Sequence, residues 1–387
     1  MKPIRVAIVG CGAISKTHVR AIQSFPTATI TALVAPSGTS SNDLADKIQN
    51  ENCPRPGTFT TLTEALRADN FDLAVITTPS GLHVELGMQA LSAGKHVVIE
   101  KPVDTDLSRA KKLEAAAVQA ASRGIVASVI SQHRFDPASM VVSQATKQGR
   151  FGRLASAVAS VPWWRSQRYY DSQEWRGTWG TDGGGAFMNQ GVHTVDLLLS
   201  YFGRPIEIYA RTALLAHERI EVEDTAVATV TFANGAVAVL HATTAAYPGL
   251  PTRIQIMGSQ GSAVIENDRL AYFHCADGTP TAPDMGLLGD ENRAARELAE
   301  DHMIGASGQD PTVDASGHIR QYDDVIRAIK NGGEPTVTVS DAVMALITIR
   351  GIYVSATLNH PVLYGDIAAG KYSGVDVRPG VPGRGSM

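Results

Sequence analysis

Residues 1–131 alternate strand-like apolar runs with helix-like segments, and this alternation constrains the fold more than any other feature of the chain. Residues 71–79 (FDLAVITTP) and 96–100 (HVVIE) are nearly continuous apolar runs, as strands buried on both faces of a parallel sheet require. Between them, residues 83–94 have helical periodicity and end at Gly94, a common helix stop. Strands that alternate with helices form a parallel sheet with right-handed crossovers. We therefore predict a doubly wound α/β domain over residues 1–131.

From residue 132 onward the pattern changes to long runs in which apolar and polar residues alternate. Residues 225–244 contain two such runs separated by Asn234 and Gly235, and an Asn-Gly pair in this position is a strong hairpin signal. These features predict a second α+β domain over residues 132–387, built on a large, mainly antiparallel open sheet with a few helices. The length of 387 residues fits two domains. Residues 378–387 (RPGVPGRGSM) are expected to form a flexible tail.

The composition excludes several classes of partner. A net charge of -4 favours neither nucleic acid nor a membrane surface, both of which select basic patches. We find no run of about eighteen apolar residues, so no membrane span is expected, and a strand so close to the N-terminus leaves no room for a signal peptide. Cys11, Cys53 and Cys275 are odd in number and scattered, which predicts neither disulfides nor a metal site. Together these observations favour a cytoplasmic protein.

A glycine-rich turn joins the first strand to the first helix in the segment VAIVGCGAIS. The pyrophosphate of a dinucleotide needs glycine at such a turn, because a side chain would keep the backbone away from the anion. We therefore expect Gly10, Gly12, Ala13 and Ile14 to bind NAD or NADP. The third glycine of the usual pattern is replaced by Ser15.

The region after the second strand bears on the choice between the two cofactors. NAD-binding domains usually carry an acid about 20 residues after the glycine turn, where it accepts hydrogen bonds from the adenosine ribose. This chain has no acid before Asp43, and residues 34–42 read VAPSGTSSN. Ser37, together with Thr39 and Ser40, could donate to a 2′-phosphate, although no arginine lies in this stretch. The pattern favours NADP; the alternative is an NAD enzyme that leaves its ribose to water.

Three motifs occur in a characteristic order: TTPSGLH at residues 77–83, EKP at residues 100–102, and WRGTW followed by DGGG and NQGVHTVD over residues 175–196. With this order the chain resembles the Gfo/Idh/MocA oxidoreductases, the glucose–fructose oxidoreductase and inositol dehydrogenase family, over nearly its whole length. In motif it is most similar to sugar dehydrogenases of the UDP-hexosamine 3-dehydrogenase type. The resemblance implies an N-terminal Rossmann domain, an open-sheet C-terminal domain, and hydride transfer between nicotinamide and a sugar or polyol carbon. It also implies a homodimer or homotetramer formed through the outer face of the C-terminal sheet.

Lys101 follows a buried strand directly, where ligands of an open parallel sheet bind. The resemblance implies that this lysine contacts the cofactor, holds the reacting hydroxyl and stabilises its alkoxide, a role that suits a compact ammonium. The alternative is a surface lysine after a strand. Pro102 would fix the turn.

His193 is the second expected catalytic residue. Asn189, His193 and Asp196 have the spacing of one polar stripe on a helix. The resemblance implies that His193 is the general base for the hydroxyl proton, whereas a lone histidine in such a place is more often a structural hydrogen-bonder. Many family members have aspartate where this chain has Asn189, and an amide only binds or orients substrate. The division of acid–base work between Lys101 and His193 therefore stays open.

Other residues are assigned to binding through the same resemblance. Those expected to line the cofactor are Thr78, Pro79, His83, Glu100, Trp175 and Arg176. Those expected to bind substrate, besides Asn189, are Trp163, Arg165, Tyr169 and Tyr170. Aromatic faces stack on sugars and arginine donates to hydroxyls or phosphates, but a packed loop is the alternative for these last four. His133 and Arg134 have no assigned role.

These observations predict an NAD(P)-dependent dehydrogenase that oxidises a secondary hydroxyl of a pyranose, with C3 as one candidate carbon. A free sugar, a glycoside and a nucleotide sugar all remain open as substrates. One alternative is a non-catalytic NADP-binding sensor or regulator on the same fold. Another is a lyase or glycosidase that uses tightly bound NAD as a transient oxidant.

Overall fold

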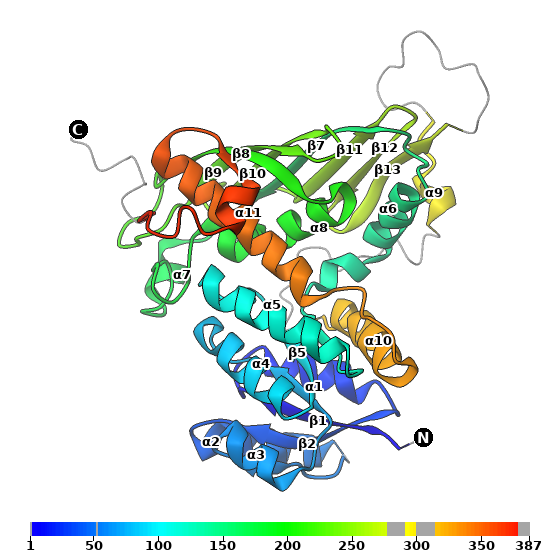
Figure 1. Cartoon of the computed structure of the whole chain (residues 1–387), viewed down its shortest axis with the longest axis vertical. Coiled ribbons are helices and arrows are strands. Elements are labelled where there is room, and N and C mark those ends of the chain that lie inside the picture. Colours follow the sequence, from blue (N-terminus) through cyan, green and yellow to red (C-terminus); the bar gives the residue numbers. More distant parts are fainter. Residues whose placement is uncertain (1, 52, 277–290, 299–313, 378–387) are drawn as a thin grey trace. The chain divides into compact units, whose positions relative to one another are not determined.

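The computed structural model divides into two compact units, each of which is described by itself (Figure 1). The first unit comprises Met1–Gln132 and Gln309–Val343, and the second comprises His133–Gly308 and Met344–Met387. The structure describes residues 2–51, 53–276, 291–298 and 314–377. The predicted tail, residues 378–387, lies outside the described residues.

The first unit is built on a six-stranded sheet in which every pairing is parallel, with the order β3-β2-β1-β4-β5-β6. Its strands are β1 (Ile4–Val9), β2 (Ala28–Val34), β3 (Gly57–Phe59), β4 (Leu73–Ile76), β5 (His96–Ile99) and β6 (Ala127–Val129). The order reverses between β1 and β4, and ligands of such sheets bind beyond the carboxyl ends of the strands at this switch point. The predicted doubly wound domain is confirmed.

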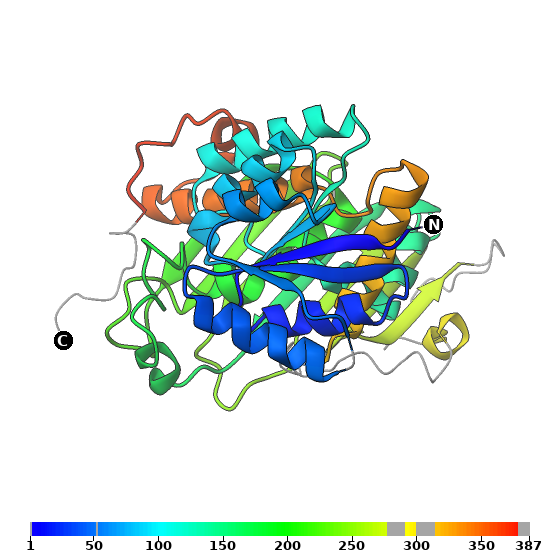
Figure 2. The ribbon, with the colours of Figure 1, turned by 90° about the horizontal axis from the view of Figure 1, so that it is seen from below.

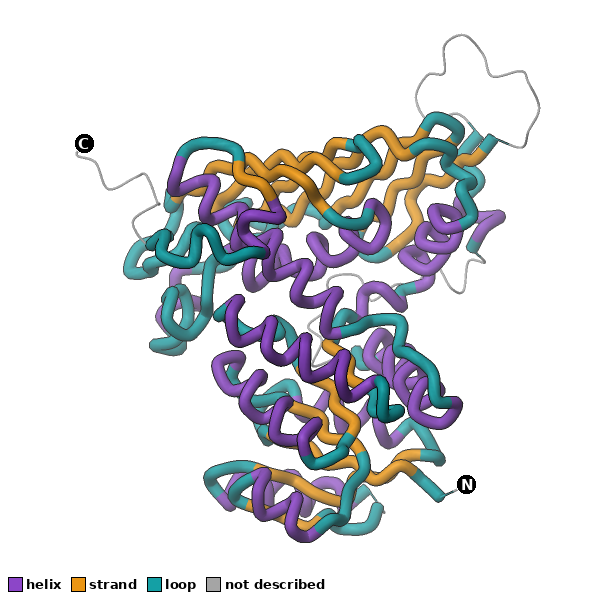
Figure 3. Tube along the Cα trace, in the orientation of Figure 1, coloured by secondary structure: helices purple, strands orange, loops and turns teal. Residues whose placement is uncertain are grey.

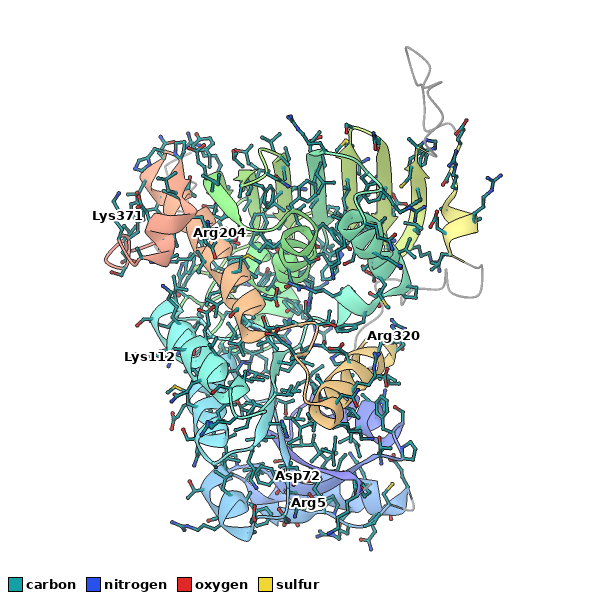
Figure 4. All side chains as sticks on the ribbon, turned by 45° about the vertical axis from the view of Figure 1, so that its right-hand side comes forward. Arg5, Asp72, Lys112, Arg204, Arg320 and Lys371 are labelled. Carbon is teal, nitrogen blue, oxygen red and sulfur yellow. The ribbon has the colours of Figure 1, made fainter. Side chains whose placement is uncertain are left out.

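Helices cover both faces of this sheet: α1 and α2 lie on one face, and α4 and α5 on the other (Figure 2). The helical segments that follow the strands are α1 (Ser15–Gln23), α2 (Gly38–Asn50), α3 (Leu62–Ala68), η1 (Ser80–Leu82), α4 (His83–Ser92) and α5 (Leu107–Ala121). At the opposite edge from the carboxyl ends, Arg5 and Asp72 form an ion pair of 2.6 Å that links β1 to the start of β4 (Figure 4). The ion pair therefore connects the two strands at the amino end of the sheet.

A helix from far along the chain completes the first unit. In α10 (Ser316–Asn331), Tyr322 and Val325 are buried in the same apolar core as Val19 and Ile22 of α1. A sequence pattern does not reveal this contact, because α10 follows the second sheet in chain order. Because α10 packs here, its titratable side chains lie in the interior beside β5.

The second unit is built on an eight-stranded sheet with the order β13-β12-β11-β7-β10-β9-β8-β14. All pairings are antiparallel except that of β7 with β10. The strands are β7 (Leu154–Pro162), β8 (Pro205–Ala213), β9 (Thr225–Phe232), β10 (Val237–Thr243), β11 (Arg253–Gly258), β12 (Gly261–Glu266), β13 (Arg269–Cys275) and β14 (Val362–Leu363). Thus the predicted mainly antiparallel sheet is confirmed, and the Asn-Gly pair lies in the β9–β10 turn.

One face of this sheet packs against helices and the other is open (Figure 3). On the open face, Val158, Val227 and Val239 are 37%, 45% and 44% exposed. The helical segments of this unit include η2 (Gln132–Phe135, which begins at the unit boundary), α6 (Pro137–Lys147), α7 (Gln167–Asp171), η3 (Ala186–Gly191), α8 (Val192–Phe202), α9 (Ala294–Glu297) and α12 (Tyr364–Ala368). On this face the exposed valines stand among polar residues such as Ser160, Thr229 and His241.

The helix α11 (Val339–Leu358) begins in the first unit and continues into the second. Among the described helices it alone is long and apolar enough, by length and composition, to cross a bilayer, and 67% of its most apolar window is buried in the protein. Core helices of water-soluble proteins meet the same criteria, so this is weak evidence for a membrane span.

Candidate active site

The turn after β1 contains two glycines with different reasons to be glycine. Gly10 has φ +104°, and a Cβ built on it would lie 2.7 Å from the backbone of Thr77 at the end of β4. A Cβ on Gly12 would meet nothing within 4 Å. Ser15, which replaces the third glycine, donates from Oγ to the Gly12 carbonyl at 2.6 Å. Gly10 therefore serves the fold, whereas Gly12, next to exposed Ala13 and half-buried Ile14, leaves space for a ligand.

This difference predicts opposite results for two alanine substitutions. Gly10→Ala is expected to lower the free energy of unfolding by about 2 kcal/mol or more, because the methyl group meets backbone in a left-handed conformation. Gly12→Ala is expected to keep wild-type stability but to weaken NADH and NADPH binding at least about tenfold, since pyrophosphate sites need close backbone approach. Urea unfolding and nucleotide fluorescence titration measure both effects. Equal nucleotide affinity in Gly12→Ala and wild type would contradict this assignment.

The loop between β2 and α2 contains no acidic side chain. The sequence suggested a loop through residue 42, but α2 begins at Gly38, with Ser37 as an N-cap whose side chain makes no capping bond. The first turn of α2 contains no acid, and a helix N-terminus attracts anions. An arginine does lie near this region, although none occurs in residues 34–42. Arg55 reaches α2 from the segment before β3 and donates to Asn42 at 3.1 Å and Asp46 at 3.0 Å. It comes from outside the loop, where no sequence signal points to it.

Beyond the carboxyl end of β4, Thr78 is half-buried and Pro79 is exposed. The Thr78 hydroxyl oxygen is buried and has no hydrogen-bond partner within the described part of the chain. Such an unsatisfied hydroxyl fits a site that a bound polar group completes. Together with the open space at Gly12, this makes the edge of the sheet suitable for NAD or NADP.

Glu100, at the end of β5, is held by a buried network. Its Oε1 accepts from His18 Nε2 at 2.9 Å and its Oε2 accepts from the Lys101 backbone N–H at 3.0 Å. His318 Nε2 lies 3.7 Å from the same Oε1. Burial would raise the pKa of Glu100, but the hydrogen bond from His18 and the nearby His318 outweigh it and hold this pKa well below its usual value. Glu100 is therefore an ionised carboxylate that orients the next residue in the chain.

The protonation of His18 follows from the same geometry. Burial lowers the pKa of His18 in spite of Glu100, so the neutral ring donates from Nε2. Its Nδ1 then accepts from the Tyr322 hydroxyl at 2.6 Å. The sequence motifs suggest cofactor contact for Glu100 and contain no signal for His18 or Tyr322.

Lys101 is half-buried, and its ammonium makes no hydrogen bond or ion pair with any residue that the structure describes. The Lys101–Pro102 peptide bond is cis. His83 is 1% exposed, and its Nδ1 and Nε2 lie 2.8 Å from the carbonyl oxygens of Pro102 and Thr78. His83 thus connects the ends of β4 and β5 and orients this turn. A lysine with an uncommitted ammonium at this place is suited to bind a substrate oxygen.

In the second unit, a π-helix, η3, precedes α8 and places Asn189. This differs from the single α-helical stripe expected for Asn189, His193 and Asp196, since a π-turn changes the phase of residues before Val192. Buried Glu223 organises the segment: it accepts from the N–H groups of Gly185 at 2.9 Å and Phe187 at 3.1 Å, and burial raises its pKa to about 7. The Asn189 amide donates to the Gly184 carbonyl at 3.1 Å.

His193 lies half-buried on α8 beside the two residues that the sequence left unassigned. The rings of His133 and His193 are 5.0 Å apart in an edge-to-face arrangement. Arg134 donates two hydrogen bonds, of 2.7 and 2.6 Å, to the buried carboxylate of Asp196. The two consecutive residues therefore contact the face of α8 that carries His193.

The segment that precedes the π-helix forms an alternating stack of aromatic rings and arginines. Arg165 lies 5.1 Å from the ring of Trp163 and 5.3 Å from that of Tyr169. Arg176 lies 4.0 Å from Tyr169 and 5.2 Å from Trp175. Neither guanidinium has an ion pair within the described residues, and the buried Nε atom of each has no hydrogen-bond partner there. Two positive charges on a rigid aromatic support can bind an anionic or hydroxylated ligand.

Tyr170 differs from its neighbours. It is 6% exposed, its hydroxyl bonds to Thr244 at 2.9 Å, and it packs in a small apolar cluster. His217 faces the Arg165 carbonyl with Nε2 at 2.7 Å and contacts Asp224 with Nδ1 at 3.0 Å. Tyr170 thus fits the packed-loop alternative. Glu223 and Asp224, which bind the start of η3 and His217, stand next to each other directly before β9. Two adjacent acids before an apolar strand are a signal that the sequence does contain.

Comparisons with known proteins agree with this architecture. Residues 4–128 match the family model "Oxidoreductase family, NAD-binding Rossmann fold", and residues 140–264 match "GFO/IDH/MocA C-terminal domain". The chain is similar to the WlbA dehydrogenase from Bordetella pertussis, solved in complex with NADH and UDP-GlcNAcA, with 30% identity and a TM-score of 0.77 over 94% of this chain and 98% of that one.

Two curated relatives match over a smaller part of the chain. The uncharacterized oxidoreductase YrbE from Bacillus subtilis is 28% identical over 69% of this chain and 75% of that protein. Inositol 2-dehydrogenase from Rhizobium meliloti is 25% identical over 71% of this chain and 79% of that protein. The chain is therefore an oxidoreductase whose Rossmann domain binds NAD or NADP. The chain belongs to the Gfo/Idh/MocA family of oxidoreductases.

Proposed function

We propose that this enzyme oxidises a secondary hydroxyl of a pyranose, with C3 as the favoured carbon and a nucleotide sugar as the favoured substrate. The observation that carries the proposal is the ammonium of Lys101 at the carboxyl end of β5, which has no hydrogen bond or ion pair within the described residues and lies in a turn oriented by Glu100 and His83. The site needs a group of this kind to stabilise an alkoxide.

The proposed roles follow from the chemistry of each side chain. Lys101 donates to the hydroxyl oxygen and stabilises the negative charge that develops on it. His193 accepts the hydroxyl proton, and Asn189 orients the substrate. A nicotinamide held at this edge of the sheet would supply the hydride acceptor, so that the alcohol would become a ketone while NAD(P)+ would become NAD(P)H. Gly12, Thr78, Trp175 and Arg176 are proposed to hold the cofactor.

The arginine–aromatic stack supports a nucleotide sugar over a free sugar. Guanidinium groups without a protein carboxylate suit a diphosphate or a uronate, and aromatic faces suit sugar C–H surfaces. The similarity to a WlbA dehydrogenase solved with UDP-GlcNAcA points the same way. Arg165 and Tyr169 are proposed to contact the substrate, with Trp163 behind Arg165.

A cofactor-reduction screen tests the proposal. Initial rates are measured over pyranoses, inositols, glycosides and UDP-sugars, with NAD and NADP in separate series. The highest kcat/KM is expected for a UDP-sugar. Cofactor binding without turnover across the whole panel would instead support a sensor or regulator. Nucleotide that co-purifies and shows no net reduction would support a lyase or glycosidase.

Replacement of Ser37 with aspartate tests the preference for NADP. An acid at the start of α2 would accept from a ribose 2′-hydroxyl and repel a 2′-phosphate, so Ser37→Asp is expected to change the kcat/KM ratio toward NAD by about tenfold or more. Ser122→Asp, on the exposed end of α5, controls for the added charge. An unchanged ratio in Ser37→Asp would mean that this position does not face the adenosine ribose.

We propose further that the enzyme is a cytoplasmic homodimer or homotetramer. The open face of the second sheet, with Val158, Val227 and Val239 exposed, supports an interface there. All three cysteines are free, as expected in a reducing compartment.

A further inference from the structure

His133 is fixed between two carboxylates. It lies in η2, and its Nδ1 is 2.8 Å from Asp136 Oδ2 and 3.2 Å from Asp268 Oδ1. The Asp136 and Asp268 side chains are only 4% and 15% exposed, so solvent screens these charges weakly. Both contacts involve Nδ1 and orient the His133 ring. It is a fixed element of the second unit.

The charge of His133 follows from these contacts. Burial would lower its pKa, but the hydrogen bonds to Asp136 and Asp268 and their negative charges outweigh burial and raise this pKa to about 10. His133 is therefore an imidazolium throughout the range in which an ordinary histidine titrates. Its edge-to-face contact with His193, at 5.0 Å between ring centroids, brings this charge beside the proposed general base.

We propose that His133 is a permanent imidazolium that keeps His193 neutral and therefore able to accept the substrate proton. The inference rests on the proposed role of His193 and adds a positioning residue to it. An imidazolium beside a second imidazole disfavours protonation of that second ring, because two like charges about 5 Å apart repel. The contact also limits rotation of the His193 ring, so His133 influences both the protonation and the orientation of His193.

The other charged groups near this face of α8 do not reverse the effect. Arg134 and Asp196 form a bidentate pair, so their charges largely cancel. Asp136 and Asp268 oppose His133, and Asn189 is neutral. Loss of the His133 charge would remove the cation that faces both carboxylates. Removal of the cation and exposure of His193 to two anions then act in the same direction, since each favours protonation of His193.

The experiment measures the pKa of His193 directly, by NMR titration of imidazole resonances that are assigned with a His193→Asn variant. In His133→Asn this pKa is expected to rise by about 1 unit, and the acid limb of the kcat/KM profile should move by the same amount. His241→Asn is the matched control: His241 lies on β10 and bonds to Ser160 at 2.9 Å. An unchanged titration of His193 in His133→Asn would overturn the inference.

A second variant is expected to change the pKa of His193 in the opposite direction. Structural damage common to both variants would not produce opposite changes. Asp268→Asn removes one negative charge and leaves the imidazolium, so the pKa of His193 is expected to fall; asparagine also suits the positive φ of 63° at this turn. An equal or higher pKa in Asp268→Asn would count against the inference. If the NMR titrations move as expected but the kinetic profile does not, the electrostatic contact stands and His193 loses its role as base.

Discussion

Replacement of Lys101 with alanine is expected to lower kcat by about 10³-fold or more, while the dissociation constants of NADH and NADPH change less than about threefold. The reason is that Lys101 is proposed to act on the substrate oxygen, whereas the nucleotide is proposed to bind mainly through backbone and neighbouring side chains. A similar loss of kcat is expected in His193→Ala. Steady-state kinetics with the best UDP-sugar and fluorescence titration with nucleotide measure the two effects separately.

Lys112→Ala is the matched control, because Lys112 is an exposed lysine of the same unit on α5 (Figure 4). It should keep wild-type kcat. Wild-type turnover in Lys101→Ala would remove that lysine from the mechanism. A loss of nucleotide affinity equal to the loss of kcat would instead reduce Lys101 to a cofactor ligand.

Gly185→Ala is expected to lower the free energy of unfolding by about 3 kcal/mol or to prevent folding of the second unit. A Cβ at this position would lie 1.8 Å from the Glu223 carbonyl oxygen and 2.7 Å from its Oε2. Because the Gly185 N–H donates to the same carboxylate, backbone movement that relieves the clash also breaks a buried hydrogen bond.

Urea unfolding gives the comparison with wild type, and Gly180→Ala serves as the control, since a Cβ there meets nothing within 4 Å. The control should unfold within about 1 kcal/mol of wild type. Equal urea midpoints for Gly185→Ala and Gly180→Ala would show that the segment directly before the π-helix accommodates a methyl group.

Much of the fold could be predicted because both sheets have simple periods. The runs at β4 and β5 are apolar on both faces, and β9 and β10 alternate around an Asn-Gly turn, so local patterns suffice to identify them. The right-handed crossover rule gave the doubly wound arrangement but not the strand order β3-β2-β1-β4-β5-β6. Gly10 and Gly12 could be recognised from the same local context.

The supports of the site could not be predicted, because they join residues that are distant in sequence. His18 meets Tyr322 across 304 positions, and Glu223 reaches the π-helix and Tyr353 across 36 and 130. The π-helix itself keeps apolar spacing that an α-helix would share, so the pattern gave no sign of the change in phase. The ring contact of His133 with His193 likewise depends on the packing of η2 against α8.

The π-helix also has a consequence for insertions and deletions in this chain. Its wider turn accommodates an additional residue, so exchange of side chains leaves the register intact, whereas deletion of one residue between Asn189 and Val192 would rotate the residues before the deletion by about 100° around the axis. Asn189 would then point away from its present direction while His193 stayed in place. The length of this short stretch, more than its composition, fixes the direction of the Asn189 side chain relative to α8.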